Sequence, residues 1–84
     1  MSALYFTITA RDHVLADRMR EAFATTFPEA TITTVTDASL SAEWPYEIIT
    51  IGYPDISHAI TRSHGLAESV AAVWREGRAN DGNQ

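Results

Sequence analysis

Hydrophobic and polar residues alternate over the first segment of the chain, residues 3–9. Leu4, Phe6 and Ile8 take every second position, and the segment is rich in β-branched and aromatic residues. A period of two is typical of a strand with one buried face. We therefore predict a first strand that turns these three side chains toward the core.

The period changes to that of a helix in the next segment. Thr9 and Asp12 fit a capping box, and Asp12 is itself an alternative cap. Five apolar residues then recur at helical spacing, with charged residues on the opposite side: Leu15, Met19, Ala22, Phe23 and Phe27. Pro28 ends the pattern, so we predict a helix from about Arg11 to Thr26.

A second strand is predicted over residues 30–36, which are rich in Thr. Ile32 and Val35 are its bulky apolar residues, and they point to opposite faces, which is typical of a short strand or an edge strand. The following residues 37–45 form a turn-rich connection, with one helical turn over residues 39–43 as an option.

Residues 46–53 show the strongest strand pattern of the chain. Ile48 lies on one face, whereas Ile49 and Ile51 lie on the other. Apolar residues on both faces indicate a central strand. Gly52 marks a bulge or a close approach, and Pro54 with Asp55 predicts a turn.

Residues 56–62 fit two patterns. Ile56, His58 and Ile60 alternate as in a strand, while Ile56 and Ile60 are also four apart, as in a helix. We favour the strand and keep the helix as the alternative. A closing helix follows, with Ser63 as its cap and an apolar stripe of Leu66, Val70, Val73 and Trp74 beside Ala67 and Ala71.

The predicted order is therefore β-α-β-β-(β)-α. Two amphipathic helices on one face of a small, mostly antiparallel sheet of three or four strands make a two-layer α+β sandwich. The nearest common form is the ferredoxin-like fold, without its last strand. We expect residues 1–79 to form one domain and residues 80–84 a disordered tail. The missing strand leaves a sheet edge open for pairing with another chain.

Composition restricts the function. The chain has 84 residues, 45% of them hydrophobic, and no Cys, so we expect one domain without disulfides or thiolate metal sites. Its N-terminal residues lack a basic region followed by a long apolar run, and no stretch approaches about 20 apolar residues, so we expect a cytoplasmic protein outside the membrane. The net charge is −5, and the absence of Lys disfavours direct nucleic-acid binding.

The negative charge is concentrated in the middle of the chain. Residues 37–55 combine four carboxylates with three aromatic rings and contain no Lys or Arg: Asp37, Glu43, Glu47 and Asp55, with Trp44, Tyr46 and Tyr53. Aromatic residues are enriched at interaction hot spots. We predict that these residues form a partner-binding face that docks on a basic surface of a larger protein.

If that basic surface normally holds DNA or RNA, the chain would act as a competitive inhibitor that mimics nucleic acid. In size and charge it is similar to phage-encoded antagonists of host defence nucleases, although no shared motif supports the similarity.

Two other functions remain open. The chain is a candidate for a homo-oligomeric assembly protein that pairs open sheet edges, or for a small-ligand or metal-binding domain that uses His58 and His64. Asp55, His58 and His64 match no zinc spacing, and His13 has no nucleophile nearby in the sequence. We therefore expect a protein without enzymatic activity, catalytic residues, metal or cofactor.

Overall fold

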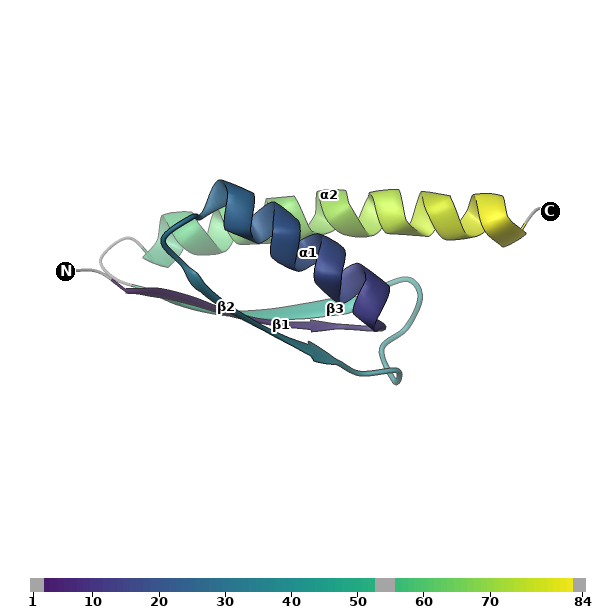
Figure 1. Cartoon of the computed structure of the whole chain (residues 1–84), viewed down its shortest axis with the longest axis horizontal. Helices are drawn as coiled ribbons and strands as arrows, with labels where there is room; N and C mark the ends of the chain where they lie inside the picture. Colours follow the sequence, from purple (N-terminus) through teal and green to yellow (C-terminus); the bar gives the residue numbers. More distant parts are fainter. Residues whose placement is uncertain (1–2, 53–55, 83–84) are drawn as a thin grey trace.

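The computed structural model describes residues 3–52 and 56–82. Their elements follow the order β-α-β-β-α of an α+β fold, as the sequence predicted (Figure 1). The elements are β1 (Leu4–Ala10), α1 (His13–Thr26), β2 (Thr31–Thr36), β3 (Tyr46–Gly52) and α2 (Ile56–Gly82). In this part of the chain, no helix is long and apolar enough to cross a membrane.

The three strands form one mixed sheet in the order β2-β1-β3. β1 pairs in parallel with β2 and antiparallel with β3. The sheet is thus less antiparallel than we expected, and β1 is the central strand, so the central position predicted for residues 46–53 is wrong. In a ferredoxin-like fold a strand separates β1 from β2, whereas here these two strands are direct neighbours.

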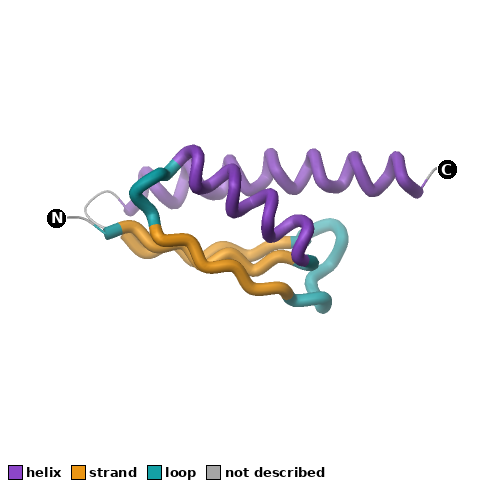
Figure 2. The backbone as a smooth tube through the Cα atoms, viewed as in Figure 1, coloured by secondary structure: helices purple, strands orange, loops and turns teal. Residues whose placement is uncertain are grey.

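Both helices lie on the same side of the sheet, so the fold has two layers (Figures 1 and 2). The side chains of β1 that face the helices are almost completely buried: Phe6, Ile8 and Ala10. Helix α1 packs over β2 and β1, and helix α2 packs over β3. The predicted core face of the first strand is confirmed.

Helix α1 begins where the sequence indicated. Asp12 is the N-cap, and its Oδ1 accepts a hydrogen bond from the backbone N of Leu15 at 3.0 Å. The buried residues Leu15, Ala16, Met19 and Phe23 of α1 face the sheet. The ring of Phe6 lies 5.1 Å from that of Phe23, with an interplanar angle of 83°, and 4.9 Å from that of Phe27. These aromatic contacts join α1 to the central strand.

Helix α2 begins at Ile56, so the strand predicted over residues 56–62 is wrong and the helical alternative is correct. Ser63 is an interior residue of the helix and not its cap. Four small buried residues repeat at a spacing of four along α2: Ala59, Ser63, Ala67 and Ala71. The predicted apolar stripe is turned inward beside this series, because Trp74 is buried and Leu66 and Val70 pack against the core.

Two further features of α2 differ from the expectation. Trp74 is buried as predicted, but Val73 is 57% exposed and lies outside the core. The helix also continues to Gly82, past residue 79, at which we expected the folded domain to end. With 27 residues, α2 is about 40 Å long at a rise of 1.5 Å per residue, and it extends beyond the end of the sheet (Figure 1).

Candidate functional site

The connection between β2 and β3, residues 37–45, crosses the end of β1. Three hydrogen bonds hold it there. The backbone N of Asp37 donates to the carbonyl of Ala10 at 2.8 Å, the N of Arg11 donates to the carbonyl of Pro45 at 2.8 Å, and the Arg11 guanidinium donates to the carbonyl of Leu40 at 2.5 Å. The connection has no helical turn over residues 39–43, so that option is not adopted.

The residues of the predicted acidic-aromatic face are divided by the structure. Asp37, Glu43, Trp44 and Glu47 are exposed, whereas Tyr46 is buried. Tyr53 and Asp55 lie outside the described residues. Tyr46 therefore cannot offer its side chain to a partner, and the surface that remains consists of three acids and one aromatic ring.

The acidic end of the sheet also contains basic side chains. Asp37, Glu43 and Glu47 lie near this end, but Arg11 and Arg75 reach it from other parts of the chain and line a pocket of about 530 Å³ together with Ala42, Glu43 and Trp74. The Arg75 guanidinium donates to the carbonyl of Glu43 at 3.4 Å. The segment 37–55 contains no Lys or Arg, yet it lies beside Arg11 and Arg75 in the folded chain. This end of the sheet therefore carries both positive and negative charges.

The Asp37 carboxylate makes hydrogen bonds within its own turn. Its Oδ1 accepts hydrogen bonds from the hydroxyl of Ser39 at 2.6 Å and from the backbone N of Ser39 at 3.0 Å. These two bonds lower the pKa of the Asp37 carboxyl below its usual value. The carboxylate therefore shapes the start of the connection, which is a structural role for a residue predicted to contact a partner.

The histidines do not converge. His13 is exposed on α1, and His58 and His64 are exposed on α2. Because His58 and His64 are six positions apart on one helix, they point about 120° apart around its axis. Among the described residues, no group of three His, Asp or Glu side chains could hold a metal ion. Asp55, the third predicted ligand, lies outside the described residues.

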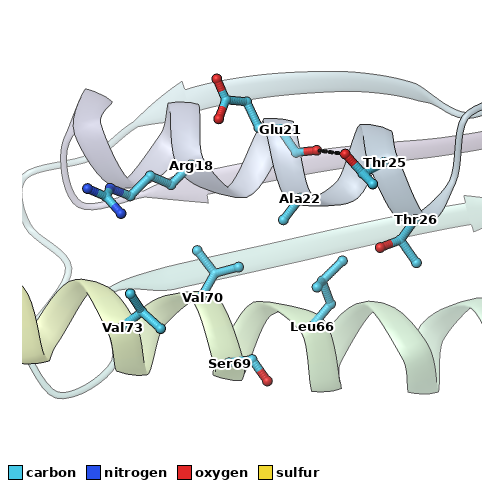
Figure 3. A pocket seen from close by; sticks show the side chains of 9 residues that line it. All are labelled: Arg18, Glu21, Ala22, Thr25, Thr26, Leu66, Ser69, Val70 and Val73. Carbon is cyan, nitrogen blue, oxygen red and sulfur yellow. Dashed lines mark hydrogen bonds between the residues drawn. The ribbon is translucent and has the colours of Figure 1, made fainter.

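A shallow groove runs between the two helices on the outer side of the helix layer (Figure 3). It has a volume of about 580 Å³, within the usual range of small-molecule pockets. Ala22, Leu66 and Val70 point into the space between the helices, while the Glu21 carboxylate points away from it. The groove is open along its length, so it offers an apolar strip and not an enclosed ligand cavity.

The most unusual surface is the side of the sheet that faces away from the helices. In the described structure no element covers this side (Figure 2). Its large apolar residues are strongly exposed: Tyr5 at 48%, Val35 at 47%, Ile49 at 62% and Ile51 at 61%. The sequence analysis missed this surface because it assumed that Ile49 and Ile51 were partly buried. The sequence analysis had predicted two helices on one face of the sheet. That prediction already implied that the opposite side of the sheet has no cover.

The strand register defines this surface, which we call the open face. Across β2, β1 and β3 its nine residues form three rows: Thr31, Tyr5 and Ile51; Thr33, Thr7 and Ile49; Val35, Thr9 and Glu47. Glu47 is the one charged residue among them. The open face is thus a surface of hydroxyl and apolar groups with a single carboxylate, on a chain with a net charge of −5.

Comparisons of the chain with family models, curated proteins and solved structures give no match. Its function must therefore be inferred from its own surfaces. Among those described above, the open face combines the strongest apolar exposure with rigid support, because all nine residues lie on paired strands.

Proposed function

We propose that this chain is a non-enzymatic protein-binding module that docks through the open face of its sheet. The observation that carries the proposal is the exposure of Ile49 and Ile51, each more than 60% accessible on a rigid strand. Single exposed apolar residues are ordinary, but contiguous apolar patches on a folded domain usually mark an interaction site. Tyr5 extends the patch to the central strand, and Val35 lies on the far edge of the same face, in the row of Thr9 and Glu47.

The composition of the open face defines the chemistry of the partner. With Glu47 as its one charge, the surface offers little for electrostatic recognition. Threonine hydroxyls can donate and accept hydrogen bonds, and Ile, Val and Tyr side chains gain free energy when they leave water. A protein surface that is flat, apolar and uncharged fits this face best.

The proposal can be tested by comparing the proteins that tagged wild type and matched variants retain from a lysate. Tagged wild-type protein, an Ile49→Thr/Ile51→Thr double variant and a Val73→Thr variant are incubated with lysate of the native host, and the retained proteins are compared. Val73 is the control, since it is an equally exposed apolar residue on the helix layer. Binding that the double variant loses and Val73→Thr keeps supports the proposal; binding that all three share contradicts it.

A second candidate is the inhibitor predicted from the sequence, which docks an acidic end on a basic, nucleic-acid-binding surface. One observation favours it: Trp44 is 56% exposed and lies in the chain next to Glu43. The presence of Arg11 and Arg75 at the same end weakens the negative field, which is why this candidate comes second.

The two candidates respond differently to salt. Electrostatic docking weakens as ionic strength rises, whereas apolar docking does not. For the acidic end, reversing Glu43 and Glu47 to Lys should reduce binding and leave the melting temperature nearly unchanged. Equal binding by the Glu43→Lys/Glu47→Lys variant would rule out this second candidate.

A further inference from the structure

We infer that the pocket between the connection 37–45 and helix α2 binds a small organic oxyanion, in which a carboxylate or phosphate group is attached to an apolar body. The pocket has a volume of about 530 Å³ and is lined by Arg11, Ala42, Glu43, Trp74 and Arg75. None of these residues belongs to the open face, so the inference does not depend on the proposed function.

Two guanidinium groups reach this pocket from distant parts of the chain. Arg11 lies just before α1, and Arg75 lies on α2. Arg11 donates to the carbonyl of Leu40 at 2.5 Å, and Arg75 donates to the carbonyl of Glu43 at 3.4 Å. Both groups are thus directed at the same short stretch of the connection. The fold therefore brings two positive charges together in space.

The hydrogen bonds of these two groups leave their charge available to a ligand. In the described part of the chain, the acceptors of both guanidinium groups are neutral carbonyl oxygens. A guanidinium has five N–H donors, so one bond to a carbonyl leaves most of them for a ligand. The lining holds Arg11 and Arg75 against the single carboxylate of Glu43, on a chain whose net charge is −5. An oxyanion would offset this local positive charge.

The rest of the lining indicates the other part of the ligand. Guanidinium groups bind carboxylate and phosphate oxygens through paired, charge-assisted hydrogen bonds. Ala42 and Trp74 add apolar wall beside them, and Trp74 is only 5% exposed, so the core holds its ring in place. The volume is larger than a single anion needs and lies within the range of small-molecule pockets. The ligand therefore carries an apolar part next to its anionic group.

Titration with phenyl phosphate at constant ionic strength, followed by ¹⁵N NMR, tests the inference. The indole N–H signal of Trp74 should shift and reach saturation. The chain has two Trp, so Trp44→Phe assigns that signal. We expect a dissociation constant on the order of 1 mM, which is ordinary for so small a ligand. Benzoate should shift the same signal, whereas phenol, which is uncharged at neutral pH, should bind at least about tenfold more weakly.

Three variants separate the pocket from a general effect of charge. Arg75→Gln should weaken binding about tenfold, because it removes one of two charged donors. Glu43→Gln should strengthen binding about twofold, since it removes a carboxylate that repels the ligand. Arg18→Gln changes the net charge as Arg75→Gln does, but at an exposed residue outside this pocket, and should bind like wild type. Arg11 is left unchanged because its bond to the Leu40 carbonyl also holds the connection.

Three results would overturn the inference. The first is no saturable shift of the Trp74 signal at about 20 mM phenyl phosphate, well above the expected dissociation constant. The second is equal affinity in wild type and Arg75→Gln; if Arg75→Gln melts at a lower temperature, Glu43→Gln decides instead, and no gain in its affinity is the contradicting result. The third is equal binding of inorganic phosphate and phenyl phosphate, which would rule out an organic ligand. Ile49→Thr/Ile51→Thr should bind phenyl phosphate like wild type, so this test is separate from that of the open face.

Discussion

The rings of Trp44 and Tyr46 stack with their centroids 5.3 Å apart and 26° between their planes, yet Trp44 is 56% exposed and Tyr46 only 2%. Trp44 lies in the connection from β2, and Tyr46 begins β3 with its side chain on the helix side of the sheet. The stack therefore closes one end of the core. Trp44 covers Tyr46, and the outer surface of Trp44 remains available.

Replacing Tyr46 by Phe should stabilise the fold. The Tyr46 hydroxyl is buried and makes no hydrogen bond among the described residues. A buried polar group without a partner costs about 1–3 kcal/mol, so Tyr46→Phe should raise the free energy of unfolding by about 1 kcal/mol at neutral pH. Urea unfolding of the two proteins measures the difference. A loss of stability would show that the hydroxyl has a partner after all.

The same residue should make stability depend on alkaline pH. Burial raises the pKa of the Tyr46 phenol above its usual value of about 10, and the Glu68 carboxylate adds to this effect, while Arg75 opposes it. Above pH 10 the unfolded phenol loses its proton first, so stability is complete below pH 10 and falls as the pH rises through the pKa of the folded state.

Melting temperatures between pH 8 and pH 11 check this dependence. The alkaline loss should be smaller in Tyr46→Phe than in wild type. Tyr5→Phe is the control, since Tyr5 is 48% exposed on the open face. An equal alkaline loss in all three proteins would contradict the assignment to Tyr46.

The sequence predicted the type of most elements because their periods are local properties. Residues 3–9 alternate and residues 11–26 follow a helical stripe, and the structure has β1 and α1 at these places. In residues 56–62 both periods were present. The choice between helix and strand is decided by residues beyond this segment. Ala67 and Ala71 continue the series of small residues that begins with Ala59 and Ser63, and its spacing of four is that of a helix.

The arrangement of strands and charges was harder to predict, since it depends on contacts between distant residues. Nothing near Glu43 in the sequence indicates that Arg11 and Arg75 lie beside it, 32 residues away in each direction. Glu47 and Ile49 were assigned to different surfaces, although the period of two places them on the same face of β3. The candidate site was therefore predicted in part, and its apolar centre was missed.

Replacing Gly65 by Ala should stabilise helix α2. Gly65 lies inside the helix, and a Cβ added there meets no atom within 4 Å. Gly in a helix interior costs about 0.5–1 kcal/mol relative to Ala, which corresponds to several degrees in the melting temperature of a domain this small. Gly52→Ala is a useful contrast, because its Cβ would lie 2.5 Å from Cδ1 of Leu4. We expect no gain at Gly52, and a gain at both positions would contradict the packing.

Replacing Asp12 by Ala should weaken the start of α1. The Asp12 carboxylate accepts the hydrogen bond from the backbone N of Leu15, and losing such a cap costs about 1 kcal/mol. Asp12→Asn keeps an oxygen in the same position and should recover most of the stability. Urea unfolding of the three proteins measures both effects. Equal stability of Asp12→Ala and wild type would show that the cap contributes nothing.

Ile48 and Ile49 offer a matched test of which face of β3 is buried. Ile48 is packed against the core opposite Ile8, whereas Ile49 is 62% exposed on the open face. Thr keeps the preference for a strand, so the same Ile→Thr change isolates burial. Ile48→Thr should lower the free energy of unfolding by about 2 kcal/mol, because it removes buried apolar area and adds a hydroxyl to the core. Ile49→Thr should change it by less than about 0.5 kcal/mol at monomer concentrations. Similar losses at both positions would mean that the open face is covered within the monomer, and the proposed function of this face would then be wrong.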